Sequence, residues 1–174
     1  IGVVNVVDSL IAREVDCGVY LNAGREVGVA STKSFTSQVI VLSLIAVWFA
    51  QKRDVNANKR RQYVRDLRNI HVNMERVLSN CYQKMNEYVD FFRDFPNCFL
   101  LGKGRGHAIA LEGALKIKEI AYIHAEGYSA SSLKHGPLAL LIKDFPVILL
   151  HTHPEHASKI HNVYRELKSR DAKI

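Results

Sequence analysis

The 174-residue chain has few of the residues that mark disulfide-rich, fibrous or membrane-spanning proteins. Its three cysteines, Cys17, Cys81 and Cys98, are an odd number without close spacing, so they indicate neither a disulfide framework nor a CxxC site. Four prolines and ten glycines exclude collagen-like and low-complexity architectures. The longest apolar stretch, residues 39–50, is much shorter than the roughly 20 residues that cross a bilayer. We therefore predict no membrane span and a reducing, cytoplasmic setting.

Hydrophobic residues make up 48% of the chain, which is enough to build a core, and the net charge is +7. The charge raises the question of an anionic partner, either nucleic acid or a phosphorylated small molecule. Between Lys52 and Arg76, eight basic residues stand against three acidic ones, so most of the excess is local. The apolar and aromatic residues of this stretch fall on one helical face. This favours a solvated basic helix face, and we predict no nucleic-acid partner.

Short β-branched runs alternate with longer helical patterns, which is typical of an α/β fold with a parallel sheet flanked by helices in three layers. The chain is expected to form strands at 3–7, 18–21, 97–101 and 147–150 and helices at 31–50, 107–124 and from about 154 onward. One or two amphipathic helices are expected within 52–94, and a loop at 125–137. A hydroxyl of Ser31 or Thr32 is the expected N-cap of the helix at 31–50.

Three charged residues of the predicted helix 107–124, Glu112, Lys116 and Glu119, fall on one side of that helix. One interpretation is a solvated face with an i,i+4 ion pair. Apolar residues surround the rest of the helix, however, which favours an enclosed cleft. A carboxylate and an ammonium held in a cleft suit proton transfer beside a carbonyl, because one moves the proton while the other stabilises negative charge on oxygen.

Two further segments carry candidate residues with two interpretations each. His135, between Lys134 and a Gly-Pro turn, is either a surface residue or an acid/base that works near neutral pH. The segment 28–33 combines small residues with hydroxyls at a helix start, which suits either simple capping or binding of an oxyanion or phosphate.

Two other patterns are weaker. Gly102-x-Gly104-x-Gly106 follows a strand, but no acidic residue ends a second strand about 20 residues on, as a dinucleotide site requires. The histidine-rich stretch 151–156 has metal-ligand residue types but no partner ligands elsewhere. We predict no metal site and no cofactor.

Three long motifs, residues 22–38, 111–127 and 133–140, closely resemble the isomerase part of the glutamine–fructose-6-phosphate aminotransferase family, also called glucosamine-6-phosphate synthases. That part is built from two sugar-isomerase (SIS) domains. In the family's terms, residues 1–55 are the rear part of the first SIS domain, 56–88 are connecting helices, and 89–174 are the front part of the second. The resemblance implies a transferase of hexosamine biosynthesis that makes glucosamine 6-phosphate and glutamate from fructose 6-phosphate and glutamine.

The resemblance also implies roles for single residues. Glu119 matches the base that moves a proton between C1 and C2 of the sugar, and Lys116 matches the lysine near the reacting oxygens. Glu112 matches a second carboxylate of the site. His135 matches the histidine that helps to open the sugar ring from the neighbouring subunit, which implies a homodimer. The segment that lines the sugar pocket matches Val29, Ala30, Ser31 and Thr32.

The sequence also departs from the family. A glutaminase domain is expected in the parent protein but not within these 174 residues. The family's main phosphate-binding loop would precede Ile1 and its imine-forming lysine would follow Ile174, so we expect the chain alone to be inactive. Ser131 and Ser132 stand where the family usually has Gly-Glu. Alternatives are another SIS-type sugar-phosphate isomerase or deaminase, or a non-catalytic module that binds sugar phosphates.

Overall fold

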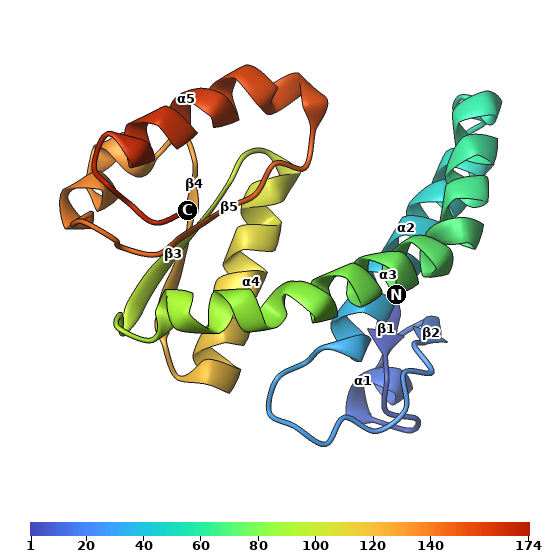
Figure 1. The fold of residues 1–174 in the computed structure, drawn as a ribbon. Helices are drawn as coiled ribbons and strands as arrows, with labels where there is room; N and C mark the ends of the chain where they lie inside the picture. The colour runs from blue at the N-terminus through green and yellow to red at the C-terminus, as the bar shows by residue number, and fades with distance from the viewer. The chain divides into compact units, whose positions relative to one another are not determined.

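The chain divides into two units, residues 1–82 and 83–174, and the boundary lies inside the long helix α3 (Ala57–Phe92). This computed structural model describes all of residues 1–174 (Figure 1). The stretch 52–94 was expected to hold one or two helices, and the structure has one of 36 residues.

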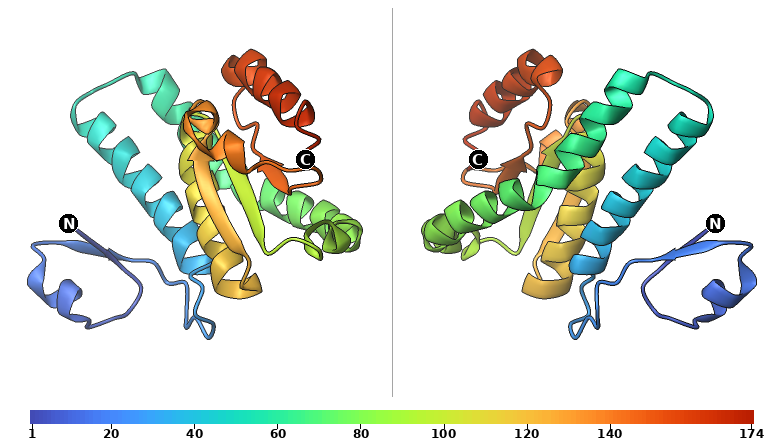
Figure 2. Two further views of the ribbon diagram at one scale, coloured as in Figure 1. Left: turned by 90° about the vertical axis from the view of Figure 1, so that its left-hand side faces the viewer. Right: turned by 90° about the vertical axis from the view of Figure 1, so that its right-hand side faces the viewer.

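The first unit begins with two short parallel strands, β1 (Gly2–Val4) and β2 (Gly18–Tyr20), joined through the single-turn helix α1 (Leu10–Glu14). The strand predicted at 3–7 ends at Val4. The side chain of the next residue, Asn5, is taken up by bonds to the loop that follows β2, so the extended pattern does not continue. The helix predicted at 31–50 is α2 (Lys33–Lys52), which forms a hairpin with the start of α3 (Figure 2).

Helix α2 is longer than the apolar stretch 39–50 that it contains. An 18-residue window of this 20-residue helix has a mean hydropathy of 1.5, so by length and composition the helix could cross a membrane, although the sequence predicted no membrane span. Only Ser34 of this helix is buried, and side chains such as Trp48 and Phe49 are half exposed. A helix with this much uncovered apolar surface needs a covering layer, and the core helix of an α/β domain fits the description as well as a membrane span.

The second unit contains the predicted three-layer arrangement. Its parallel sheet has the order β4-β3-β5, with β3 (Asn97–Gly102) between β4 (His124–Ser129) and β5 (Val147–Leu149). Alternate residues of β3 point to opposite faces: Cys98 and Leu100 pack with α4 (Arg105–Ala121), whereas Phe99 and Leu101 pack with α5 (Ala157–Lys168). The two helices therefore cover opposite faces of the sheet, as Figure 1 also shows.

The loop predicted at 125–137 was wrong in its first part, because residues 124–129 form β4. This strand pairs with β3 along six residues, from Asn97 opposite His124 to Gly102 opposite Ser129. Its sequence, His-Ala-Glu-Gly-Tyr-Ser, has no apolar run, and only the pairing partner makes it a strand. The preceding helix was predicted to reach His124 but ends at Ala121, where Tyr122 adopts a left-handed conformation with φ 57°.

Two glycines allow α4 to lie close to the sheet. A Cβ on Gly102 would lie 2.0 Å from the carbonyl oxygen of Gly106, and a Cβ on Gly127 would lie 2.7 Å from Leu111 Cα. Both obstacles are backbone atoms, so no side chain could move aside. The glycine-rich turn 102–106 thus serves a tight strand-to-helix connection.

Three single turns complete the second unit. They are η1 (Leu133–His135), η2 (Pro137–Leu140) and η3 (Pro154–His156). Leu133 is fully buried in the core between the sheet and α5, which fixes the turn that ends in His135.

Candidate active site

Helix α4 presents the three charged residues on the side that faces away from the sheet. Ala110 and Ala114 are buried against β3 and β4. At about 100° per residue, Glu112, Lys116 and Glu119 lie on the opposite side of the helix. The close packing of small residues against the sheet therefore leaves this charged stripe directed outward.

Lys116 joins both carboxylates of the stripe. Its Nζ donates to Glu119 Oε2 at 2.6 Å and lies 3.5 Å from Glu112 Oε1. The three side chains are only partly exposed: 26% for Glu112, 21% for Lys116 and 24% for Glu119. The structure thus brings together the three residues that the helical spacing predicted as one group.

The charges of the stripe favour an ammonium at Lys116. The hydrogen bond to Glu119 is the largest influence and raises the pKa of Lys116, while desolvation acts in the opposite direction. A lysine that keeps its proton cannot serve as a base at neutral pH, but it can stabilise negative charge on a nearby oxygen. Proton removal therefore falls to a carboxylate of the group.

Apolar residues flank the stripe. Leu111, Leu115 and Ile120 are about half exposed beside it. Two surface cavities, one lined by Arg60 and Arg68 and the other by His151 and Tyr164, include no residue of the stripe. The enclosed cleft expected from the sequence stays a prediction.

His135 lies in the second unit at the end of η1, with an exposed side chain. Its turn is anchored by the two residues that precede it: Leu133 is buried, and Lys134 Nζ lies 2.7 Å from Glu166 Oε1 of α5. No hydrogen bond or ion pair joins His135 to Glu119 or Lys116. The fold holds the turn in place and directs the histidine outward.

The serine at position 131, where the family usually has glycine, has a partner in the fold. Lys103 Nζ donates to Ser131 Oγ at 2.6 Å, which ties the glycine-rich turn to the segment before His135. No local sequence pattern predicts this pair, because the two residues are 28 positions apart.

Val29, Ala30, Ser31 and Thr32 lie in the first unit, in the loop that leads from β2 into α2. Val29 is 91% exposed. Thr32 is the N-cap of α2, but neither its hydroxyl nor that of Ser31 makes the predicted capping bond. That part of the prediction was wrong, because a residue further back in the loop provides the acceptor instead.

The acceptor is Glu26, which the sequence analysis did not single out. Its Oε1 accepts from the backbone N–H of Thr32 at 2.9 Å and of Ser34 at 3.1 Å, and its Oε2 accepts from Ser34 Oγ at 2.5 Å. The side-chain bond from Ser34 is the largest of several hydrogen bonds that lower the pKa of Glu26 to about 2. The available signal was an acidic residue shortly before an apolar helix, where it complements the positive end of the helix dipole.

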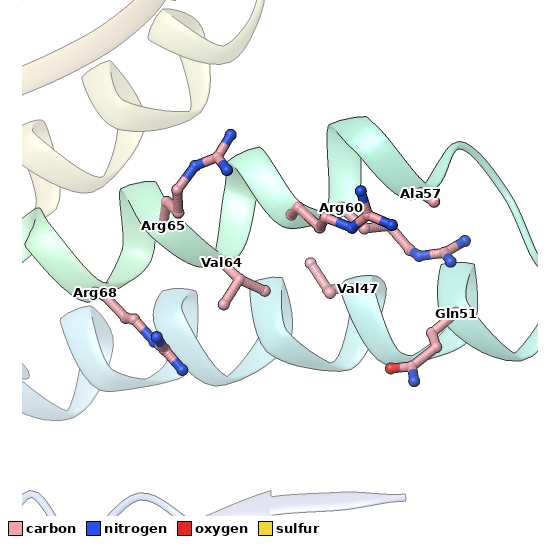
Figure 3. A pocket seen from close by; sticks show the side chains of 8 residues that line it. Val47, Gln51, Ala57, Arg60, Val64, Arg65 and Arg68 are labelled. Carbon is pink, nitrogen blue, oxygen red and sulfur yellow. The ribbon is translucent and has the colours of Figure 1, made fainter.

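The basic stretch forms a surface cavity of about 470 Å³ between α2 and α3 (Figure 3). Arg60 closes the hairpin: its guanidinium donates to the carbonyl oxygens of Ala50 and Val55 and pairs with Asp54. Arg65 points away from α2 in Figure 3. Because the arginines diverge rather than converge on one point, we assign no ligand to this cavity. It is lined by Val47, Gln51, Ala57, Arg60, Arg61, Val64, Arg65 and Arg68.

The histidine-rich stretch lies around the start of α5. The rings of His153 and His156 are 6.1 Å apart, and His151 lines a cavity of about 700 Å³ with α5 residues such as Ile160 and Tyr164. No group of three or more His, Cys, Asp or Glu side chains is arranged to hold a metal ion.

Comparison with known proteins supports the resemblance. The SIS domain family model matches residues 1–48 and 91–174. The chain is 45% identical over all 174 residues to a probable glutamine–fructose-6-phosphate aminotransferase (isomerizing) from Acanthamoeba polyphaga mimivirus. The C-terminal domain of glucosamine-fructose-6-phosphate aminotransferase from Francisella tularensis superposes with a TM-score of 0.93 at 36% identity over 97% of this chain.

A more distant likeness extends to the fold alone. Glucosamine-6-phosphate deaminase from Thermotoga maritima has a TM-score of 0.77 at 22% identity, covering 99% of this chain and 50% of that one. The chain itself spans 28% of the length of the mimivirus relative and 48% of the Francisella domain. The resemblance and the α/β fold predicted from the motifs are confirmed.

Proposed function

Because this chain belongs to the SIS domain family, we propose that it is part of the isomerase portion of a glutamine–fructose-6-phosphate aminotransferase. The relative that is 45% identical over the whole chain supports this assignment. The whole protein then converts fructose 6-phosphate and glutamine into glucosamine 6-phosphate and glutamate, a step of hexosamine biosynthesis. The three cysteines, all unpaired, suit a cytoplasmic protein.

The observation that carries the proposal is the contact of Lys116 with Glu119 beside Glu112. Ketose–aldose isomerisation moves a proton between two neighbouring carbons. Glu119 takes the proton from one carbon while the electron pair shifts toward the adjacent oxygen, which gives an enediol-like intermediate. The Lys116 ammonium stabilises the charge on that oxygen. Glu119 then returns the proton to the other carbon, while the hydroxyl proton of the first carbon moves to the charged oxygen and a new carbonyl forms on the first carbon.

The domain plan follows from the same family. We assign residues 1–55 to a first SIS domain, 56–88 to connecting helices and 89–174 to a second SIS domain. The family model supports this plan by matching on both sides of residues 49–90. Helix α2 lies almost wholly inside the first matched range, so we assign its apolar surface to the interior of a SIS domain and not to a membrane.

One of the remaining site residues, His135, has a proposed role that needs a second subunit. His135 helps to open the sugar ring in the site of a neighbouring copy, so the working form is a homodimer. Its exposed side chain on an anchored turn supports this role. Val29, Ala30, Ser31 and Thr32 line the sugar pocket.

Incubation of the full-length protein with fructose 6-phosphate and glutamine tests the proposal, with glucosamine 6-phosphate detected by mass spectrometry. We expect product that requires both substrates. Release of ammonia from glucosamine 6-phosphate without glutamine would instead assign a deaminase. Calorimetric binding of fructose 6-phosphate without turnover would assign a non-catalytic module.

The 174-residue chain by itself is proposed to be inactive. The family's principal phosphate loop and imine-forming lysine are not among its motifs. Formation of glucosamine 6-phosphate by the isolated chain, with ammonium as nitrogen donor, would overturn this part of the proposal.

A further inference from the structure

The loop between β2 and α2 contains the proposed sugar-lining segment 29–32, and its start is tied to β1. Asn5 Oδ1 accepts from the backbone N–H of Ala23 at 3.0 Å, and Asn5 Nδ2 donates to the carbonyl oxygen of Gly24 at 2.7 Å. The Asn5 side chain thus supplies one acceptor and one donor to the loop backbone, as the backbone of a paired strand would. The loop leaves the sheet in a fixed direction.

The end of the loop is held by Glu26. Its carboxylate accepts three hydrogen bonds from Thr32 and Ser34, all of which lie beyond residue 31. The bonds therefore close a ring around residues 27–31, with Glu26 on one side of the segment and the helix start on the other. Ser31 is attached to the same group, because its Oγ lies 2.6 Å from Ser34 Oγ, which already donates to Glu26.

These bonds are the only side-chain cap of α2. The first N–H groups of a helix have no partner within the helix, and a side-chain acceptor normally satisfies one or two of them. Thr32, in the N-cap position, makes no such bond. Glu26 supplies both the missing acceptor and a negative charge at the positive end of the helix.

Within the segment 27–31 that these hydrogen bonds enclose, the valine side chains are exposed. Val27 and Val29 are 90% and 91% exposed, whereas Ser34 at the base is buried. A backbone closed at its base with exposed side chains at its tip is suited to present those side chains to a ligand in one arrangement. Since the ordering is present before a ligand arrives, its entropic cost does not reduce the affinity.

We propose that Glu26 is a positioning residue that holds residues 29–32 in the conformation that binds the sugar phosphate. This inference rests on the proposed function. Glu26 itself need not touch the sugar, because its three bonds go to the protein backbone and to Ser34.

The variant Glu26→Gln tests the proposal in the full-length protein. Glutamine keeps one acceptor oxygen, but its NH2 group cannot accept from the Ser34 hydroxyl and it carries no charge. We expect the KM for fructose 6-phosphate to rise about tenfold with kcat nearly unchanged, as for the loss of one or two charge-assisted hydrogen bonds. Amide hydrogen exchange at Thr32 and Ser34 is expected to accelerate at the same time.

Glu14→Gln is the matched control, because Glu14 is an exposed carboxylate of the same unit with no hydrogen bond or ion pair. It should change neither readout. Faster exchange at Thr32 and Ser34 with an unchanged KM would overturn the positioning role, and so would unchanged exchange. If the wild-type protein fails to bind fructose 6-phosphate in calorimetry, the proposed function has failed, and the exchange measurement still reports separately on the hydrogen bonds of Glu26.

Discussion

The Lys116 ammonium lies 2.6 Å from one carboxylate oxygen of Glu119, nearly an ångström closer than to the carboxylate of Glu112. One turn of α4 thus holds a proton acceptor and a fixed positive charge side by side. This is the arrangement that an enediol-like intermediate requires, because the proton leaves carbon while charge builds on the neighbouring oxygen.

Removing the Lys116 charge is expected to slow isomerisation. In Lys116→Gln the intermediate loses its nearest cation, so kcat should fall by a factor on the order of 100 to 1,000, with a small change in KM. Steady-state kinetics with fructose 6-phosphate measures both constants. Lys118→Gln, an exposed lysine of the same helix, is the control. A kcat for Lys116→Gln within twofold of wild type would remove Lys116 from the catalytic group.

Glu26 should remain ionised far below the pH at which an ordinary glutamate is protonated. Its pKa is lowered from 4.5 to about 2, chiefly by the hydrogen bond from Ser34. A depressed pKa means that the stabilisation is complete above about pH 4.5 and is lost as the pH falls through about 2. The carboxyl carbon shift of Glu26, followed by NMR, should titrate with a midpoint near pH 2. A midpoint near pH 4.5 would show that the three hydrogen bonds are not formed in solution.

The contact of α4 with β4 should not tolerate a side chain at residue 127. A Cβ there would lie 2.7 to 2.8 Å from backbone atoms of Leu111 and Ala110, so Gly127→Ala must push the helix away from the sheet. Overpacking of this kind costs about 1–3 kcal/mol, and urea unfolding measures it. At Gly28 nothing lies within 4 Å of the added methyl, so Gly28→Ala is the control. Equal stability of the two variants would contradict the close approach.

Sequence reasoning succeeded where the information is local. The spacing of Glu112, Lys116 and Glu119 follows from the helical repeat alone, and the alternation of strand and helix patterns predicted β3 and β5 of the second unit. Both depend on residues that lie within about two helical turns or within one strand of each other.

It failed where the partner is distant in the chain or of an unexpected kind. The residues of β4 have no strand-like pattern and become a strand only through pairing with β3, whose own residues lie 27 positions earlier. The cap of α2 was assigned to hydroxyls at the helix start, but Glu26 reaches it from six positions back. Loop closure of this kind is set by backbone geometry that propensities do not contain.

The proton transfer assigned to Glu119 is the central claim, and one variant tests it most directly. In full-length protein, Glu119→Gln keeps the size of the side chain and a hydrogen-bond acceptor for Lys116, but it cannot accept a proton from carbon. We expect conversion of fructose 6-phosphate to the aldose product to fall at least about 1,000-fold, while glutamine hydrolysis remains close to wild type. Isomerisation at the wild-type rate in this variant would contradict the account.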